Sequence, residues 1–233
     1  MKVIAHIESP YTGKFGIPRQ AGLAGVPAQI VFEAEYRNPE AVRGLEGFDY
    51  IWLIWSFSEI EESKWQPTVR PPRLGGNRRI GVFATRSPYR PNKIGLSSVR
   101  LIRIETDTTR GPILHIEGAD ILDQTPIYDI KPYLPYTDSH AEARSGFAGQ
   151  PWKPELEVIV PDSLRHIMPE RLYAPLRESL SQDPRPQYHN DPERLYVMPF
   201  DRWDIKFRVT ENRLTIEAIE PTKEVPRDVP NDL

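Results

Sequence analysis

The sequence predicts a mainly β protein, with an N-terminal β-barrel followed by a small α+β domain. Three observations support this fold class. The 233 residues include 25 prolines and 14 glycines, which disfavour long uninterrupted helices over most of the chain. Residues 1–138 hold short runs of β-branched and aromatic residues separated by turns. After residue 154, helical and strand patterns are mixed.

Seven strands are expected in the first part of the chain, at residues 2–8, 29–35, 49–57, 80–85, 97–105, 112–118 and 126–130. The 49–57 run is rich in aromatic and β-branched residues, so we expect a central strand buried on both faces. The 97–105 run alternates apolar residues with arginines, which indicates a half-buried strand. A short helix is expected at 38–44, with Asn38 as its N-cap and a proline in its first turn. Many short strands with Pro- and Gly-rich turns predict a closed or nearly closed barrel over residues 1–138.

The remainder of the chain is interpreted as a linker, a second domain and a tail. Residues 139–154 are small, polar and Gly-containing, which is typical of a linker or an ordered loop. In the second domain, 155–221, we expect two helices and three strands, at 162–168, 170–182, 194–199, 204–209 and 213–218. The last two strands are expected to form a hairpin with its turn at 210–212. The polar, Pro-rich residues 222–233 predict a disordered tail.

The composition excludes several classes of site. There is no cysteine, which excludes disulfides, thiolate zinc sites and a cysteine nucleophile. The five histidines are widely separated, so no metal site is expected. The glycine-rich dinucleotide and phosphate motifs and the Gly-x-Ser-x-Gly motif of hydrolases are absent. No apolar run is long enough to span a membrane and no leader segment is expected, so we expect a cytoplasmic protein.

Positive charge is concentrated in residues 65–104. This segment holds nine lysines and arginines and no acidic residue, although the net charge of the whole chain is −3. The rest of the chain therefore carries −12. Such segregation creates a local positive field, and arginine is well suited to bind phosphates. We expect this segment to bind an anionic ligand of the RNA type; the alternative is a set of arginines scattered over a solvated surface.

Two loops inside this segment combine rigid prolines with arginines. Residues 70–77 read Arg-Pro-Pro-Arg-Leu-Gly-Gly-Asn, and residues 85–92 read Thr-Arg-Ser-Pro-Tyr-Arg-Pro-Asn. Prolines restrict the chain, so exposed arginines lose less entropy on binding; a Pro-rich structural turn is the alternative. Two further clusters, at 9–20 and 120–133, bring together charged, hydroxyl and phenol groups, and ordinary loop structure is the alternative for both.

A set of motifs spread over the chain is similar to the motifs of a known protein family. They are Pro-Arg-Gln at 18–20, Gly-Leu-Glu-Gly-Phe at 44–48, the 70–77 loop, the 81–95 segment, Asp-Ile-Lys-Pro-Tyr at 129–133, and Asp-Pro-Arg-Pro at 183–186 with Tyr188. In this order and spacing the chain resembles the TsaA-like (YaeB/TrmO) family of tRNA methyltransferases over nearly its whole length. The resemblance implies a β-barrel methyltransferase distinct from the Rossmann class, and a homodimer with the cofactor at the subunit interface.

The resemblance also implies an activity and a cofactor site. The enzyme would use S-adenosylmethionine to methylate N6 of threonylcarbamoyl-adenosine, next to the anticodon of tRNA. The implied cofactor-binding residues are Pro18, Arg19, Gln20, Ser58, Glu59, Arg86, Leu96, Leu122, Asp123, Gln124 and Thr125. Two positions depart from the family pattern, which has histidine where Ser58 stands and glycine where Gln124 stands.

Roles for the remaining candidates follow from the chemistry. A urea-like nitrogen must lose a proton when it is methylated, so a base is useful. Asp129 is the first candidate and Asp123 the second, with a structural role as the alternative, and Tyr133 would orient or stack on the modified base. Trp65 and Tyr89 are candidates for base stacking, with core packing as the alternative. The residues expected to bind tRNA are Arg70, Arg73, Arg78, Arg79 and Arg90, with Arg185 and Tyr188 on the anticodon stem-loop.

Two other functions fit the same residues. One is a non-catalytic RNA-binding barrel, which salt-sensitive tRNA affinity without cofactor binding would favour. The other is an S-adenosylmethionine-dependent enzyme that acts on a small molecule, which an absence of RNA affinity would favour.

Overall fold

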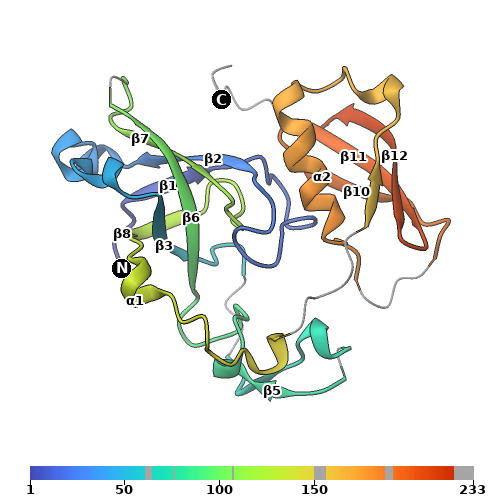
Figure 1. The fold of residues 1–233 in the computed structure, drawn as a ribbon, viewed down its shortest axis with the longest axis horizontal. Coiled ribbons are helices and arrows are strands. Elements are labelled where there is room, and N and C mark those ends of the chain that lie inside the picture. The colour runs from blue at the N-terminus through green and yellow to red at the C-terminus, as the bar shows by residue number, and fades with distance from the viewer. Residues whose placement is uncertain (61–64, 76, 107, 150–155, 187–190, 223–233) are drawn as a thin grey trace.

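The structure, a computed structural model, describes residues 1–60, 65–75, 77–106, 108–149, 156–186 and 191–222 (Figure 1). It consists of a closed barrel and a separate four-stranded sheet with one helix beside it. The predicted class, a mainly β protein with an N-terminal barrel, is confirmed. Within the described residues, no helix is long and apolar enough to cross a membrane.

The barrel has six strands in the order β1-β2-β7-β6-β3-β8, and every neighbouring pair is antiparallel. The strands are β1 (Ala5–Glu8), β2 (Pro27–Phe32), β3 (Tyr50–Ser56), β6 (Ile94–Glu105), β7 (Ile113–Glu117) and β8 (Pro126–Pro132). Closure leaves no unpaired edge, which explains how short strands form a stable sheet.

Strand β3 shows how the barrel interior is filled. Ile51, Leu53 and Trp55 point inward and are buried, while the residues between them are half-buried or exposed. The prediction that this strand is buried on both faces was wrong. The reason is that the outer face of β3 is only partly covered: Tyr50 is 46% exposed, and Trp52, which donates to Asp138 at 2.8 Å, is half-buried.

The predicted strand at 80–85 is also different in the structure. Only β5 (Ile80–Gly81) is extended, and it pairs with β4 (Thr68–Val69) in a two-stranded ribbon outside the barrel. A 3-10 turn, η5 (Val82–Ala84), follows directly. Because prolines lie just before β4 and after η5, and proline lacks an N–H donor, this part of the chain pairs only briefly.

Short 3-10 turns connect the barrel strands. The predicted helix at 38–44 is the turn η2 (Pro39–Val42), and the side-chain oxygen of Asn38 caps it by accepting a bond from the Glu40 N–H, at 3.0 Å. The other short helical elements in this region are η1 (Ala34–Tyr36), η3 (Leu45–Gly47), η4 (Pro72–Leu74), α1 (Pro135–Asp138) and η6 (Gly146–Ala148).

The second unit is a four-stranded sheet of order β10-β11-β12-β9 with helix α2 beside it (Figure 1). Its elements are β9 (Glu157–Ile159), η7 (Asp162–Leu164), η8 (Glu170–Leu172), α2 (Tyr173–Ser181), β10 (Tyr196–Phe200), β11 (Trp203–Thr210) and β12 (Arg213–Pro221). The predicted helix at 162–168 forms only the single turn η7, since its N-cap residue is a proline that offers no side-chain cap. The predicted tail lies almost entirely outside the described residues.

The connection between β1 and β2, residues 9–26, contacts the barrel part of the chain, where the Gly22 N–H donates to the Gly118 oxygen at 2.8 Å, and also packs against the second unit. Tyr11 is fully buried in the core of the second unit, and its hydroxyl lies 2.8 Å from the hydroxyl of Ser179 on α2. The N–H of Gly25 donates to Glu178 of α2, at 2.6 Å. Phe15 stacks near Tyr196, with ring centroids 6.2 Å apart. The second unit therefore supports this loop.

Candidate active site

The cavity that most of the predicted cofactor-binding residues line, called the main cavity below, lies at one end of the barrel, where several loops meet. Its volume is about 540 Å³. The β1–β2 loop, the segment that follows β3, the 85–90 loop, the start of β6 and the β7–β8 connection all contribute to its wall. These segments come from five parts of the sequence, and the closed barrel holds them together.

An aromatic and aliphatic wall forms one side of the cavity. Trp55 and Phe57 lie with ring centroids 4.4 Å apart, next to Ile94 and Leu96. The Trp55 ring packs closely against Gly95, since a Cβ at that position would come within 2.2 Å of the indole. Gly95 is thus required for the position of this ring.

Polar contacts join the loops around the cavity. The guanidinium of Arg86 donates to the side-chain oxygen of Gln20, whose amide nitrogen donates to the backbone oxygen of Arg19. Two lysines bond to the segment after β3: Lys14 donates to the backbone oxygen of Glu59 at 2.6 Å, and Lys93 donates to that of Ile60 at 2.8 Å. These bonds hold two loops and the residues after β3 at fixed positions.

One carboxylate at the cavity is held by buried partners. Asp120, in the β7–β8 connection, accepts a 2.5 Å bond from the hydroxyl of Ser97, which in turn accepts a 3.0 Å bond from the indole N–H of Trp55. Burial raises the pKa of Asp120, while the Ser97 bond and the charge of Arg86 act in the opposite direction. The site prediction from sequence did not include Asp120 as a functional residue; its only signal was its place in the 120–133 cluster.

Comparison with known proteins identifies the family. The sequence profile of the tRNA-methyltransferase O N-terminal domain matches residues 6–139, and that of the TrmO C-terminal domain matches residues 153–222. The chain belongs to the tRNA-methyltransferase O family.

Sequence and structure similarity to individual proteins support the assignment to the tRNA-methyltransferase O family. The chain is 40% identical to the tRNA (adenine(37)-N6)-methyltransferase of Escherichia coli (strain K12) over 94% of this chain and 96% of the relative. It is 47% identical to the protein of the same name from Eikenella corrodens, over 74% of this chain and 97% of the relative. A crystal structure of TrmO from Pseudomonas aeruginosa matches with a TM-score of 0.74 and 32% identity, over 94% of this chain and 98% of the other.

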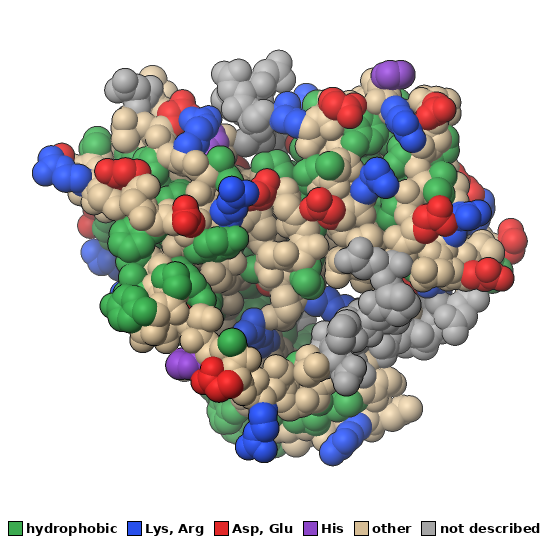
Figure 2. All heavy atoms as spheres, in the orientation of Figure 1, with side chains coloured by type: hydrophobic (Ala, Val, Ile, Leu, Met, Phe, Trp, Pro, Cys, Tyr) green, Lys and Arg blue, Asp and Glu red, His purple; other side chains and the backbone are tan. Residues whose placement is uncertain are grey.

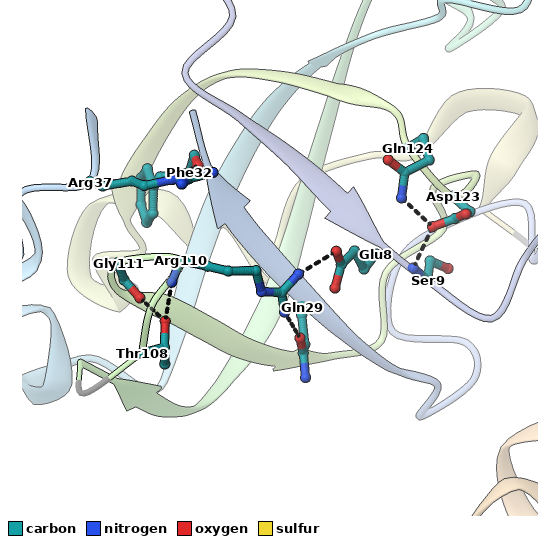
Figure 3. A network of polar contacts seen from close by, with 10 residues as sticks. All are labelled: Glu8, Ser9, Gln29, Phe32, Arg37, Thr108, Arg110, Gly111, Asp123 and Gln124. Atoms are coloured by element: carbon teal, nitrogen blue, oxygen red, sulfur yellow. Dashed lines mark hydrogen bonds and ion pairs between the residues drawn. The ribbon is translucent and has the colours of Figure 1, made fainter. Parts of the chain in front are cut away.

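The structure brings together most of the residues that the tRNA-methyltransferase O resemblance implies for the cofactor. Those that line the main cavity are Pro18, Arg19, Gln20, Ser58, Glu59, Arg86, Leu96, Leu122 and Thr125. Asp123 and Gln124 do not line it. The carboxylate of Asp123 accepts bonds from the Ser9 N–H, at 3.0 Å, and from the Gln124 amide, at 3.2 Å (Figure 3). Gln124 has a φ of 61°, a backbone conformation that favours glycine.

None of the three catalytic candidates, Asp123, Asp129 and Tyr133, lines the main cavity. Asp129 borders a second cavity of about 560 Å³, which shares no lining residue with the first. Its carboxylate lies 3.1 Å from Lys131. Tyr133 packs beside Trp52, with ring centroids 5.6 Å apart. Asp129 is paired across the sheet with Ile54, which is paired with Leu96 on the next strand. Because Leu96 lines the main cavity, Asp129 lies about two strand spacings, roughly 10 Å, from the edge of that cavity.

The basic segment of this tRNA-methyltransferase O chain has exposed arginines. Arg70, Arg78 and Arg86 are exposed, and within the described part of the chain no carboxylate pairs with them. Arg79 is exposed and donates to the hydroxyl of Thr68 at 2.9 Å. Lys and Arg side chains mark the lower end of the molecule in Figure 2, the end at which β5 lies in Figure 1. Of these four arginines, Arg86 also lines the main cavity.

The other four predicted tRNA contacts differ from these. Arg90 borders the cavity and donates to the backbone oxygens of Thr85 and Ser87, so it shapes its own loop. Arg185 is 11% exposed and makes two bonds to the buried carboxylate of Asp183, at 2.8 and 3.1 Å, which occupies its guanidinium. The side chain of Arg73 and the residue Tyr188 lie outside what the structure describes.

The two stacking candidates are at the surface. Trp65 and Tyr89 are each 49% exposed. The alternative of core packing is therefore wrong for both, and their availability for base stacking stays a prediction.

Proposed function

We propose that this chain transfers a methyl group from S-adenosylmethionine to N6 of adenosine 37 in tRNA. The observation that carries the proposal is the match to tRNA (adenine(37)-N6)-methyltransferases over nearly the full length of both chains. The cavity is compatible with it, since the implied cofactor residues meet there although they are far apart in sequence.

The residues of the main cavity fit this cofactor. A volume of about 540 Å³ lies within the range of small-molecule sites. The Trp55 and Phe57 wall offers apolar contact to an adenine ring, and Lys14, Arg19 and Arg86 offer positive charge to a carboxylate. When bound, the cofactor supplies an activated methyl group on a positively charged sulfur.

The contribution of the chain itself is mainly positioning. The bonds from Lys14 and Lys93 fix the residues after β3, and the contact between Arg86 and Gln20 fixes the two facing loops. Methyl transfer needs an in-line approach of the acceptor nitrogen, so a preorganised cavity lowers the barrier by holding that geometry.

A homodimer is part of the proposal. The outer face of β3 and β6, with the nearby α1, exposes large apolar side chains: Tyr50 at 46%, Leu96 at 55%, Ile102 at 50% and Tyr136 at 86%. A group of large, exposed apolar side chains on one face is typical of an interaction surface. Leu96 also lines the cavity, so a second copy on this face would lie beside the cavity.

The substrate assignment uses the basic segment. The exposed arginines of this segment would hold phosphates of the anticodon stem-loop, and Trp65 and Tyr89 would stack on bases that leave the loop. We further propose that the acceptor is the threonylcarbamoyl form of adenosine 37, and that the protein acts in the cytoplasm.

The test is methyl transfer with two tRNA substrates. The purified full chain is incubated with labelled S-adenosylmethionine and tRNA that does or does not carry the threonylcarbamoyl group at adenosine 37. Incorporation into the modified tRNA is the expected result. Salt-sensitive tRNA binding without incorporation would indicate a non-catalytic RNA-binding barrel, and cofactor binding without tRNA affinity would indicate a small-molecule substrate.

A further inference from the structure

We propose that Asp120 is the proton acceptor for the methylated nitrogen, and that Ser97 and Trp55 hold its carboxylate in position. The proposal rests on the methyltransferase function proposed above. It assigns the base to a residue inside the main cavity, in place of Asp129 and Asp123.

Three barrel segments build this carboxylate site. Asp120 follows β7, Ser97 lies within β6 and Trp55 lies near the end of β3. Ser97 is only 2% exposed and Trp55 only 7%, whereas Asp120 is half-buried and reaches the cavity wall. The carboxylate thus stands at the boundary between the barrel interior and the cavity.

The hydrogen bonds leave Ser97 one orientation. The indole N–H of Trp55 can only donate, so it occupies an acceptor position on the Ser97 oxygen at 3.0 Å. The single hydroxyl proton of Ser97 is then directed to Asp120, at 2.5 Å. Gly95 completes the arrangement, because it allows the indole to lie against the β6 backbone. The result is a carboxylate whose orientation is set before any substrate binds.

The electrostatic environment suits a base. Burial is the largest influence on Asp120 and raises its pKa, which makes the carboxylate a better proton acceptor than an exposed one. The bond from Ser97 and the positive charge of Arg86 limit this rise. The other charged or titratable groups in the cavity wall or behind it are Lys14, Arg19, Arg90, Glu59 and Tyr11.

The other carboxylates are less well placed. Glu59 borders the cavity, but its side chain is 62% exposed and lies 3.8 Å from Lys14. Asp123 does not line the cavity and accepts the Ser9 N–H, which ties it to the end of β1. Asp129 borders a different cavity and lies beside Lys131. Asp120 alone among these four combines burial, orientation by neutral donors and a position in the cavity wall.

The electron pairs and the proton each have a defined destination in the proposed step. The lone pair of N6 forms the new N–C bond while the bond between the methyl carbon and sulfur breaks, and that electron pair remains on sulfur. The proton of N6 passes to a carboxylate oxygen of Asp120. Asp120 becomes a neutral acid and later releases the proton to water.

The experiment compares single-turnover methyl transfer by wild type, Asp120→Asn and Ser97→Ala over a range of pH, with cofactor affinity measured by calorimetry. Loss of a general base typically lowers the rate by about 100-fold or more, so we expect that loss for Asp120→Asn with cofactor affinity unchanged. Ser97→Ala removes the bond that lowers the pKa of Asp120, so the acidic limb of its rate profile should move to higher pH. Ser97→Thr, which keeps the hydroxyl, should restore the wild-type profile.

The control is Asp162→Asn, which removes a carboxylate that is 92% exposed in the second unit and should leave the rate unchanged. The proposal is overturned if Asp120→Asn keeps the wild-type rate and pH profile. It is also overturned if Asp120→Asn loses activity because it no longer binds the cofactor, since Asp120 would then be a cofactor ligand. If the wild type itself transfers no methyl group, the proposed function fails, and this inference fails with it.

Discussion

At the scale of single residues, Gly95 is the position at which packing and the site are most closely linked. A Cβ there would come within 2.2 Å of the Trp55 indole, so Gly95→Ala must displace that ring. Overpacking of this kind costs about 1–3 kcal/mol of unfolding free energy. We expect that loss in denaturant unfolding, together with weaker cofactor binding in calorimetry.

The matched control is Gly47→Ala. A Cβ at Gly47 would meet no heavy atom within 4 Å, and the backbone there has no positive φ. This variant should keep wild-type stability and cofactor affinity. Equal behaviour of the two variants would contradict the role given to Gly95.

Asp120 gives a prediction on stability and pH. Because burial raises its pKa above the ordinary value of 3.8, the folded state binds this proton more tightly than the unfolded state. Its contribution to stability is therefore largest below the unfolded pKa and is lost as pH rises through the folded pKa. Thermal unfolding of Asp120→Asn should match or exceed wild type at pH 7, and this advantage should shrink in acid. A variant that is less stable than wild type at pH 7 would contradict this assignment.

The sequence could predict residues only where a motif carries them. Pro18, Gln20 and Arg86 came from the family resemblance, and all three line the cavity. Asp120 was not selected, because its distinguishing features are burial and a bond from Ser97, 23 positions earlier in the chain. Neither can be recognised from residue type and spacing alone.

At the scale of elements, the β1–β2 loop depends on the second unit. Tyr11→Phe removes the bond to Ser179, and Glu178→Gln weakens the contact with the Gly25 N–H. Neither residue lines the cavity. A typical hydrogen bond contributes about 1 kcal/mol, so each variant should weaken cofactor binding up to about fivefold through the loop that carries Pro18 and Gln20.

Calorimetric titration with S-adenosylmethionine measures this effect. The matched control is Glu157→Gln, which removes an exposed ion pair with Arg213 in the same unit. If Tyr11→Phe and Glu178→Gln bind the cofactor as tightly as the control does, the second unit does not support the site.

The sequence predicted strands and helices more accurately where apolar and polar side chains alternate regularly than where prolines lie close by. The last hairpin, β11 and β12, follows the predicted alternation closely. The 80–85 segment formed the two-residue strand β5 and one turn, and the 162–168 segment formed only one turn, because neighbouring prolines removed donors and caps that longer elements need. The support of the β1–β2 loop by α2 joins residues more than 150 positions apart and has no local signal.

At the scale of the whole molecule, the concentration of positive charge in residues 65–104 determines where tRNA would bind. Replacing Arg70, Arg78 and Arg79 together by alanine should weaken tRNA binding and reduce its salt dependence by about one unit of slope per arginine that contacts a phosphate. Cofactor affinity should not change, because none of the three lines the cavity. Filter binding at several salt concentrations measures both effects.

The control for this variant removes the same number of charges elsewhere. Lys2, Arg43 and Arg213 each form an exposed ion pair with a glutamate outside the basic segment. Their joint replacement by alanine should leave the salt slope almost unchanged. Equal losses in the two triple variants would show that net charge alone, and not the basic segment, governs binding.

Methylation of N6 of adenosine 37 by this barrel can be observed at the level of the single nucleoside. The measurement is mass spectrometry of nucleosides from tRNA treated with the full chain and isotope-labelled S-adenosylmethionine, alongside the same tRNA with guanosine at position 37. We expect a labelled methyl group on N6 of the nucleoside at position 37, and none in the guanosine variant. Label at another position, or no label in tRNA that the protein binds together with the cofactor, would contradict the proposed function.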